Sequence, residues 1–288
     1  MTTGDEIFRR LQSAARSTAS KHGMAAPTQE YLTRHVLESF LDRLTRTPHA
    51  DNFILKGGIL LSAYGFRRPT KDADANAVNV DVTVDHLATV VRDIAEVSVD
   101  DGVVFNLDAI TVQDIREQAE YPGLRVRVPA SIGTWTGVAA WDVSAGEPIV
   151  PPPRQASIDR ILGDPIELLG YASETTVAEK GVTILERGIA STRWRDYVDI
   201  VALSREGIDT DELLRSARAV AHHRGVVLGP VAPHLVGYGE VGQVKWAAWR
   251  RKEHLESVCE ENLDDQANLV ASYLDPIFSL GPGYGLQL

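Results

Sequence analysis

Two stretches near the beginning of the chain have the apolar spacing of amphipathic helices. In residues 29–46, apolar side chains recur every four positions, at Leu32, Val36, Phe40 and Leu44. Side chains with this spacing share one face of a helix, and residues 5–21 have a similar pattern. A third helix is expected to begin after Thr83, whose hydroxyl can cap its first turn, and to run to about residue 97.

Strand-like patterns lie between and after these helices. Residues 52–56 form a short apolar run that ends at Gly57-Gly58, which predicts a buried strand, a tight turn and then a helix over residues 59–64. Residues 72–78 are expected to form a second strand. Apolar and polar residues alternate in 124–132, and 137–144 follow after a glycine-containing turn, which predicts two further strands.

A run of prolines divides the chain into two parts of different character. Prolines stand at positions 148, 151, 152 and 153, and we expect a domain boundary there. Beyond it the periodicity is almost wholly helical, with helices predicted at 174–187, 194–204, 210–222, 243–257 and 263–274. The pattern therefore predicts an α/β (α+β) fold, with a mixed-sheet core in residues 1–150 and a helical domain in residues 151–288.

Composition excludes several classes of protein. The 288 residues contain 29 Lys and Arg against 40 Asp and Glu, a net charge of −11, which argues against a nonspecific nucleic-acid coat or a membrane-surface protein. Cys259 is the only cysteine, so an intramolecular disulfide or a thiolate metal cluster is excluded. No apolar run is long enough to span a bilayer and the first residues lack a secretory signal. We expect a soluble, cytoplasmic protein with no membrane partner.

Asp72 and Asp74 are the first candidates for chemistry. Residues two apart in a strand point to the same face, so the two carboxylates should stand side by side. Their mutual repulsion is relieved by a cation, and Mg²⁺, or Mn²⁺ in its place, prefers one or two protein carboxylates together with water and substrate phosphates. The alternative is a solvent-facing strand edge with two ordinary aspartates.

The preceding Gly57-Gly58 pair argues against an ordinary strand edge. Backbone N–H groups in a glycine turn before a helix can bind phosphate, although a plain tight turn has the same sequence. A Gly-Gly turn followed 14 residues later by Asp-x-Asp on an adjacent strand resembles the layout of the nucleotidyltransferase fold. Asp142, on a later strand, is placed to supply a third metal carboxylate, unless it is only a strand-end aspartate.

Lys180 forms the second candidate group with two aspartates of the next helix. It follows Val177 by three residues and precedes Ile184 by four, so its stem lies along the apolar face of its helix and its amine needs an anion. That anion is a bound phosphate or an internal carboxylate such as Asp199; a snorkelling side chain is the mildest alternative. Asp196 and Asp199 share a face of the following helix.

Together these stretches resemble the AbiEii/MenT nucleotidyltransferase toxins of bacterial toxin–antitoxin systems. The similarity spans residues 55–203 and is carried by Leu55-Lys56-Gly57-Gly58, Arg67-Arg68-Pro69-Thr70-Lys71-Asp72-Ala73-Asp74, Ala178-Glu179-Lys180 and Arg193-Trp194-Arg195-Asp196-Tyr197-Val198-Asp199. It implies a nucleotidyltransferase core and a helical domain with the active site in a cleft between them. Characterised family members transfer nucleotides from a nucleoside triphosphate to the 3′ end of tRNA and block translation.

The resemblance also implies roles for single residues. Asp72 and Asp74 would bind magnesium, Lys180 the triphosphate, and Asp199 would act beside it as a candidate base. The nucleotide-binding positions are Lys56, Gly57, Gly58, Thr70, Lys71 and Lys180. In the family, some antitoxins silence the toxin by phosphorylating the hydroxyl position that corresponds to Thr70. A phosphate there would add nearly two negative charges beside the metal carboxylates, whereas the alternative is a threonine that only hydrogen-bonds the loop.

The expected function is therefore a metal-dependent, toxin-type nucleotidyltransferase acting on tRNA, with a cognate antitoxin as partner. Basic residues around the motifs favour a charge-dense acceptor; they are Lys56, Arg67, Arg68, Lys71, Lys180, Arg187, Arg193 and Arg195. A kinase or protein-directed nucleotidylating enzyme would use the same pocket. A non-catalytic nucleotide-binding protein is the third alternative, and the intact charged residues weigh against it.

Overall fold

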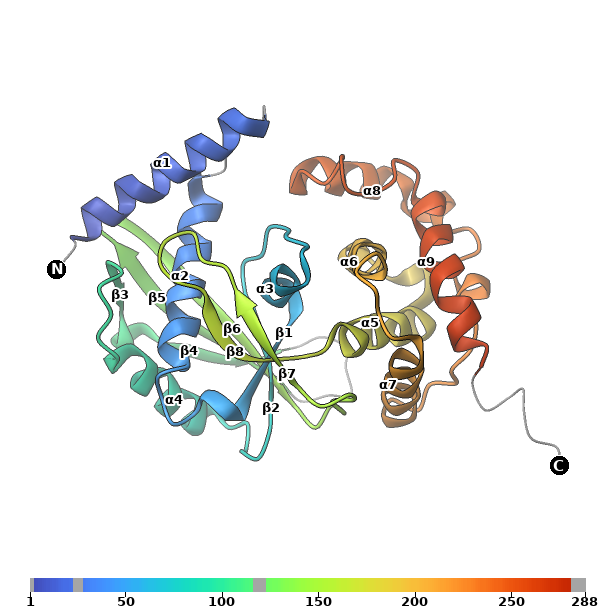
Figure 1. Cartoon of the computed structure of the whole chain (residues 1–288), viewed down its shortest axis with the longest axis horizontal. Coiled ribbons are helices and arrows are strands. Elements are labelled where there is room, and N and C mark those ends of the chain that lie inside the picture. Colours follow the sequence, from blue (N-terminus) through green and yellow to red (C-terminus); the bar gives the residue numbers. More distant parts are fainter. Residues whose placement is uncertain (1–2, 23–27, 116–122, 281–288) are drawn as a thin grey trace. The chain divides into compact units, whose positions relative to one another are not determined.

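A computed structural model describes residues 3–22, 28–115 and 123–280 of the chain (Figure 1). The chain divides into two compact units. The first contains Met1–Ala63, Pro69–Gly146 and Gln155–Gly170, and the second contains Tyr64–Arg68, Glu147–Arg154 and Tyr171–Leu288.

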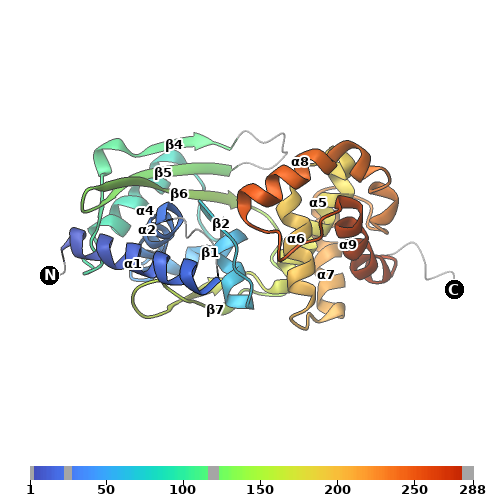
Figure 2. The same ribbon diagram turned by 90° about the horizontal axis from the view of Figure 1, so that it is seen from above.

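A mixed sheet is the centre of the first unit (Figure 2). Its strands within the described residues are β1 Phe53–Lys56, β2 Ala73–Ala77, β3 Val103–Phe105, β4 Thr111–Asp114, β5 Gly123–Ile132, β6 Trp135–Ala145, β7 Arg154–Ile158 and β8 Ile166–Gly170. They are ordered β3-β5-β6-β2-β1-β8-β7, with β4 also paired to β5. The strands β1 and β2 are antiparallel, as are β5 and β6, whereas β2 runs parallel to β6 and β1 parallel to β8.

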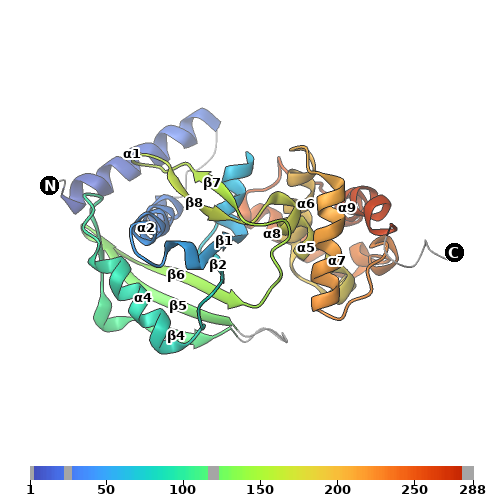
Figure 3. The same cartoon turned by 60° about the horizontal axis from the view of Figure 1, so that its bottom comes forward.

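Helices of the first unit cover this sheet. They are α1 Gly4–His22, α2 Thr28–Leu44, the short α3 Gly57–Leu60 and α4 Val84–Glu96, with 3₁₀ turns at Ala50–Asn52, Leu61–Tyr64 and Leu107–Ala109. The α2 helix packs on β6, and α1 packs on β5 (Figure 3). In the core, the Trp141 ring lies 5.4 Å from that of Phe40 and 4.6 Å from that of Phe53, between centroids. Thr83 caps α4 as predicted, accepting a hydrogen bond from the backbone N–H of His86.

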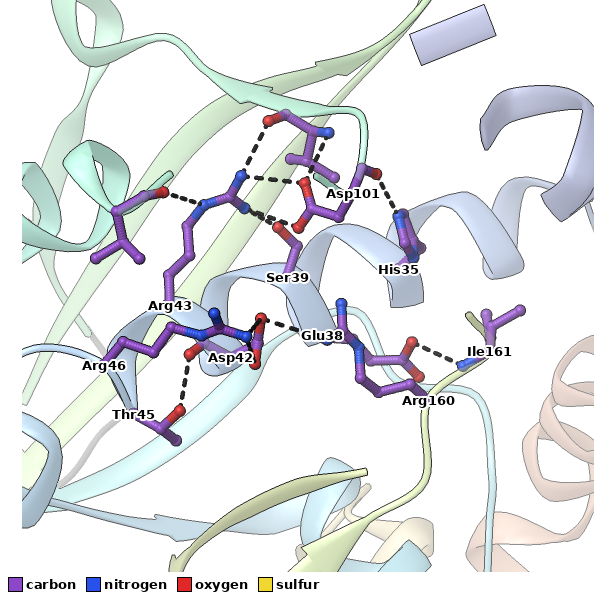
Figure 4. A network of polar contacts seen from close by, with 12 residues as sticks. His35, Glu38, Ser39, Asp42, Arg43, Thr45, Arg46, Asp101, Arg160 and Ile161 are labelled. Atoms are coloured by element: carbon purple, nitrogen blue, oxygen red, sulfur yellow. Dashed lines mark hydrogen bonds and ion pairs between the residues drawn. The ribbon is translucent and has the colours of Figure 1, made fainter. Parts of the chain in front are cut away.

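Buried polar side chains fasten α2 to neighbouring loops (Figure 4). The Arg43 guanidinium donates to both carboxylate oxygens of Asp101, at 3.1 and 3.0 Å, and to the Ser39 hydroxyl. Glu38 accepts a hydrogen bond from the backbone N–H of Ile161, 3.0 Å away. Because buried charges are costly unless paired, this network fixes how α2 lies against the sheet that carries the candidate site.

The second unit is built mainly of helices. They are α5 Ser173–Arg187, α6 Trp194–Ser204, α7 Thr210–His223, α8 Tyr238–Glu253 and α9 Leu263–Phe278, with 3₁₀ turns at Gly188–Ala190 and Ala232–His234. The α5 and α9 helices approach closely at Gly181, where an added Cβ would lie 2.7 Å from the Phe278 ring. Buried aromatic side chains, Tyr197, Tyr238 and Trp246 among them, fill the rest of the core. Within the described residues, none of the helices combines the length and hydropathy that a bilayer crossing requires.

The fold class and most elements agree with the sequence-based expectation, but the strands β3, β4, β7 and β8 were not predicted. Residues beyond the proline run were expected to be helical, but β7 and β8 lie there and Gln155–Gly170 belongs to the first unit. Leu55 of β1 pairs with Gly170 of β8, so the strand is defined by a partner far away in sequence. The pattern of Ile166–Gly170 alone has no regular alternation, which is why local periodicity does not reveal it.

Candidate active site

The turn between β1 and α3 is shaped by Gly57. Its φ of +72° lies in the left-handed region, which favours glycine. Lys56 pairs with Asp74 across the β1–β2 ladder, so the turn comes directly beside the second aspartate. A Cβ at Gly57 would lie 2.0 Å from Oδ2 of Asp74. Both the backbone conformation and the close approach therefore require glycine.

Asp72 directly precedes β2, and Asp74 is the second residue of that strand. Ala73 and Ala75 are buried, whereas the two aspartates are half-buried. This alternation agrees with the prediction that the two carboxylates share a face of the strand. The hydroxyl of Thr70 lies 3.3 Å from both the backbone oxygen and Oδ1 of Asp72. These contacts agree with the alternative in which Thr70 hydrogen-bonds the loop to the strand. Phosphorylation of Thr70 remains a prediction.

Charged residues continue from Asp74 across neighbouring strands. Lys56 of β1 is opposite Asp74 of β2, Asp74 is opposite Asp142 of β6, and Asp142 is opposite Arg125 of β5. We call these four residues the charge row. Residues directly opposite one another in a sheet lie on one face, and like charges in that position destabilise it. The central pair of aspartates is thus flanked by one cation on each side.

Arg125 is the residue of this row that the sequence analysis missed. Its Nε and Nη2 donate to the two oxygens of Asp142 at 2.6 and 2.5 Å, and Nη2 lies 3.7 Å from Oδ2 of Asp72. The hydrogen bonds that Arg125 donates to Asp142 raise the pKa of Arg125 above its ordinary value, with further contributions from the charges of Asp142, Asp72 and Asp74 that outweigh its partial burial. The alternation in 124–132 indicates that Arg125 faces away from the core, but only the β5–β6 register identifies its partner.

The residues of the first unit fit a divalent cation held by two carboxylates. Asp72 and Asp74 provide the oxygen ligands that Mg²⁺ prefers, and the Asp74 carboxylate occupies the position that a Gly57 side chain would take. In the part of the chain described here, no group of three or more His, Cys, Asp or Glu side chains is arranged to hold a metal. Asp142 is adjacent to Asp74, but both of its oxygens accept hydrogen bonds from Arg125. Its role as a metal ligand remains a prediction.

The second candidate group lies in the second unit, on α5 and α6. The Lys180 amine lies 2.5 Å from Oδ1 of Asp196 and 2.9 Å from Oδ2 of Asp199. The Lys180 side chain is 13% exposed and that of Asp199 is 0% exposed. The predicted internal salt bridge between Lys180 and Asp199 is therefore present, and Asp196 joins it.

Two arginines complete this ion network. Arg68 donates from Nε and Nη2 to the two oxygens of Asp199 at 2.7 and 2.9 Å, and Arg193 donates from Nε to Asp196 at 2.8 Å. Each carboxylate thus binds Lys180 and one arginine. The sequence motif contains Arg68 and Asp196, but local spacing does not indicate that Arg68 of a loop binds a carboxylate of α6.

The network determines the charge states of its members. Burial alone would lower the pKa of Lys180, but the charges of Asp196 and Asp199 outweigh it and raise the pKa above 10.5. Burial alone would raise the pKa of Asp199, but Lys180 and Arg68 hold it below its usual range. The pKa of Asp196 is likewise lowered, by Lys180 and Arg193 against the effect of burial. The amine stays charged and both carboxylates stay ionised near neutral pH.

The structure thus divides the predicted site residues between two groups. Lys56, Gly57, Asp72, Asp74 and Asp142 come together in the first unit, whereas Lys180 and Asp199 come together in the second. Lys71 of the first unit is exposed. Several of the basic residues that favoured a charge-dense acceptor bind carboxylates of their own chain, namely Arg68, Lys180, Arg193 and Arg195.

Comparison with solved structures finds similar chains at low identity. JHP933 of Helicobacter pylori is 14% identical, with 87% of this chain and 92% of that chain covered and a TM-score of 0.46. A candidate nucleotidyltransferase of H. pylori is 14% identical, with 87% and 95% covered and a TM-score of 0.49. An antigenic nucleotidyltransferase-like protein of Paracoccidioides brasiliensis is 16% identical, with 66% and 88% covered and a TM-score of 0.38.

Comparison at the level of families is more informative. None of the curated proteins matches the chain significantly. The family model described as nucleotidyl transferase AbiEii toxin, type IV toxin–antitoxin system, matches residues 39–274, which include both candidate groups. The chain belongs to the AbiEii nucleotidyltransferase toxin family.

Proposed function

We propose that this chain is a metal-dependent nucleotidyltransferase that moves a nucleotide from a nucleoside triphosphate to RNA, with the 3′ end of tRNA as acceptor, and that this transfer blocks translation. The observation that carries the proposal is the arrangement at Gly57 and Asp74, where the glycine turn lies against the carboxylate. The family match supports the reaction class. The RNA acceptor and the cognate antitoxin partner rest on what membership of a toxin–antitoxin family implies.

In this proposal Asp72 and Asp74 hold Mg²⁺ or Mn²⁺. When bound, such an ion supplies positive charge that stabilises the oxygens of a reacting phosphate. The backbone N–H groups of Gly57 and Gly58 and the amines of Lys56 and Lys71 are proposed to bind the triphosphate. Donors that are already in position stabilise developing negative charge without reorganisation, which is the main protein contribution to phosphoryl chemistry.

Lys180 is proposed to donate a hydrogen bond to a phosphate oxygen. Lys180 donates a hydrogen bond to Asp196 and forms an ion pair with Asp199. An ammonium group carries three N–H donors, so a donor beyond the one that Asp196 accepts is proposed for the substrate, while the two carboxylates keep the amine charged. Because the pKa of Asp199 is held below its usual range, its carboxylate is a weak proton acceptor at neutral pH. This favours a positioning role for Asp199 over that of a general base.

A transfer assay with two labels separates this function from the alternatives. The protein is incubated with Mg²⁺, total RNA or total protein, and each nucleoside triphosphate labelled at the α- or the γ-phosphate. Nucleotidyl transfer to RNA places the α-label, and not the γ-label, on RNA. A γ-label on either acceptor would instead identify a kinase, and an α-label on protein would identify a protein-directed enzyme. Absence of label from every acceptor would contradict a catalytic function.

A further inference from the structure

Arg125 has hydrogen-bonding capacity that its partners in the sheet do not use. Its Nε and Nη2 bind Asp142, and the Nη2 edge also faces Asp72. No contact with the described residues is recorded for Nη1, and the side chain is 40% exposed. A guanidinium has five N–H donors in a fixed plane, so one edge can be held by a carboxylate while the other binds an anion.

The charge row explains why a cation is needed at this position. Asp74 and Asp142 are directly opposite one another, and Asp72 adds a third carboxylate nearby. An incoming polyphosphate is repelled by this group unless cations compensate for it. Lys56 provides one at the β1 end of the row and Arg125 provides another at the β5 end.

We propose that Arg125 binds a phosphate group of the nucleoside triphosphate, and that Asp142 is a positioning residue that holds its guanidinium rather than a metal ligand. This inference rests on the proposed function and adds a substrate-binding residue to the same site. The two hydrogen bonds that the guanidinium donates to Asp142 fix its plane before the substrate arrives. Such preorganisation reduces the entropic cost of binding a flexible side chain to phosphate.

The nearby Arg127 provides a matched control. It lies two residues further along β5, on the same face of the strand, opposite Ala140. Its side chain is exposed, and no carboxylate partner is recorded for it among the described residues. Replacing Arg127 therefore removes the same charge from the same strand without touching the charge row.

The first experiment measures binding of tripolyphosphate, a probe that contains no base, to the full chain in saturating Mg²⁺ by titration calorimetry. We expect Arg125→Ala to raise the Kd about 10-fold or more, because a charge-assisted hydrogen bond is lost. Arg125→Lys, which keeps the charge but not the planar fork, is expected to lie between wild type and Arg125→Ala. Arg127→Ala should stay within about 2-fold of wild type. Equal effects of Arg125→Ala and Arg127→Ala would overturn the proposal, because only general charge would then matter.

A second measurement excludes a purely structural role. Binding of Mn²⁺ without phosphate, followed by electron paramagnetic resonance, should be as tight in Arg125→Ala as in wild type or tighter, because a cation beside Asp72 has been removed. Parallel loss of Mn²⁺ and tripolyphosphate binding would show that the variant damages the site, and would overturn the assignment. Arg125→Lys gives the same comparison if the alanine variant fails to fold.

A double-variant cycle tests the role of Asp142. We expect Asp142→Asn to raise the Kd for tripolyphosphate less than Arg125→Ala does, and to add nothing in the Arg125→Ala background. Additive effects would mean that Asp142 acts independently of Arg125, and would overturn its role as a positioning residue. If Arg125→Ala binds tripolyphosphate like wild type while Asp74→Asn abolishes nucleotide transfer, the role of Arg125 is overturned and the proposed function is retained. If Asp74→Asn still transfers nucleotides, the proposed function itself is overturned.

Discussion

Gly57 and Asp74 approach so closely that the glycine has no room for a side chain: an added Cβ would lie 2.0 Å from the Asp74 carboxylate. The turn of β1 into α3 and the first residues of β2 are therefore adjusted to each other. In the proposed function this contact brings the triphosphate-binding turn and a metal carboxylate together.

Replacing Gly57 by alanine is expected to reduce nucleotide transfer by about 100-fold or more. Asp74 must move away from the added methyl group, and a displaced metal carboxylate no longer holds the reacting groups in position. Gly146 is the matched control, since its φ of +83° is also left-handed but nothing lies within 4 Å of its added Cβ. Both variants should lose about 1–2 kcal/mol of stability from backbone strain. Equal activity of the two variants would mean that the contact with Asp74 is unimportant.

The polar network of α2 predicts a difference between two arginines of similar chemistry (Figure 4). Arg43 binds Asp101 with 5% of its side chain exposed, whereas Arg46 binds Asp42 with 51% exposed. Arg43→Met should lower the free energy of unfolding by about 3–5 kcal/mol, because it leaves a buried carboxylate without its partner. Arg46→Met should cost less than about 1 kcal/mol. Urea unfolding of both variants checks this, and similar losses would contradict it.

Features that depend on neighbours in the sequence could be predicted, and those that depend on distant pairing could not. The cap at Thr83 and the alternation in β5 are local, and both appear as expected. The pairing of β8 with β1 joins segments on opposite sides of the proline run, and no local pattern reveals it.

The same distinction applies to the candidate site. Asp72 and Asp74 share a face because strand geometry puts them there, so their spacing alone predicts it. Arg125 meets Asp142 only through the β5–β6 register, and Arg68 meets Asp199 only because a loop returns to α6. Both arginines were visible in the sequence, but their partners were not.

Lys180→Met is expected to lower the free energy of unfolding by about 3 kcal/mol, since it leaves two buried carboxylates with one arginine each. The control Lys245→Met removes an exposed lysine of α8 and should cost no more than about 0.5 kcal/mol. To separate structure from function, transfer is measured under conditions in which both variants are folded. A fully active, folded Lys180→Met would confine Lys180 to a structural role.

Acid should destabilise the protein partly through Asp196 and Asp199. Their pKa values are held below the ordinary 3.8 in the folded state, so the unfolded chain takes up protons first as the pH falls. Their contribution is therefore fully present above roughly pH 4 and is lost as the pH falls through the folded values. The raised pKa of Lys180 acts in the opposite direction. Its contribution to stability is present below pH 10.5 and is lost as the pH rises through the pKa of the folded state.

The unfolding midpoint in urea, measured from pH 6 to pH 3, tests the predicted loss of stability in acid. We expect Asp199→Asn to be less stable than wild type at pH 6, and this difference in stability to narrow towards pH 3. Asp164→Asn, which changes an exposed aspartate, should keep a constant, small difference from wild type. A gap that widens in acid would contradict the lowered pKa of Asp199.

The central claim is that Asp72 and Asp74 make this chain a nucleotidyltransferase, and one measurement tests it most directly. Each nucleoside triphosphate labelled at the α-phosphate is incubated with Mg²⁺, total RNA and wild-type protein, Asp72→Asn, Asp74→Asn or the control Asp81→Asn, an exposed aspartate beyond β2. We predict labelled RNA with wild type and Asp81→Asn, none when Mg²⁺ is removed by a chelator, and none with Asp72→Asn or Asp74→Asn although both fold. Wild-type labelling by a folded Asp72→Asn or Asp74→Asn variant, or undiminished labelling in the chelator, would contradict the account.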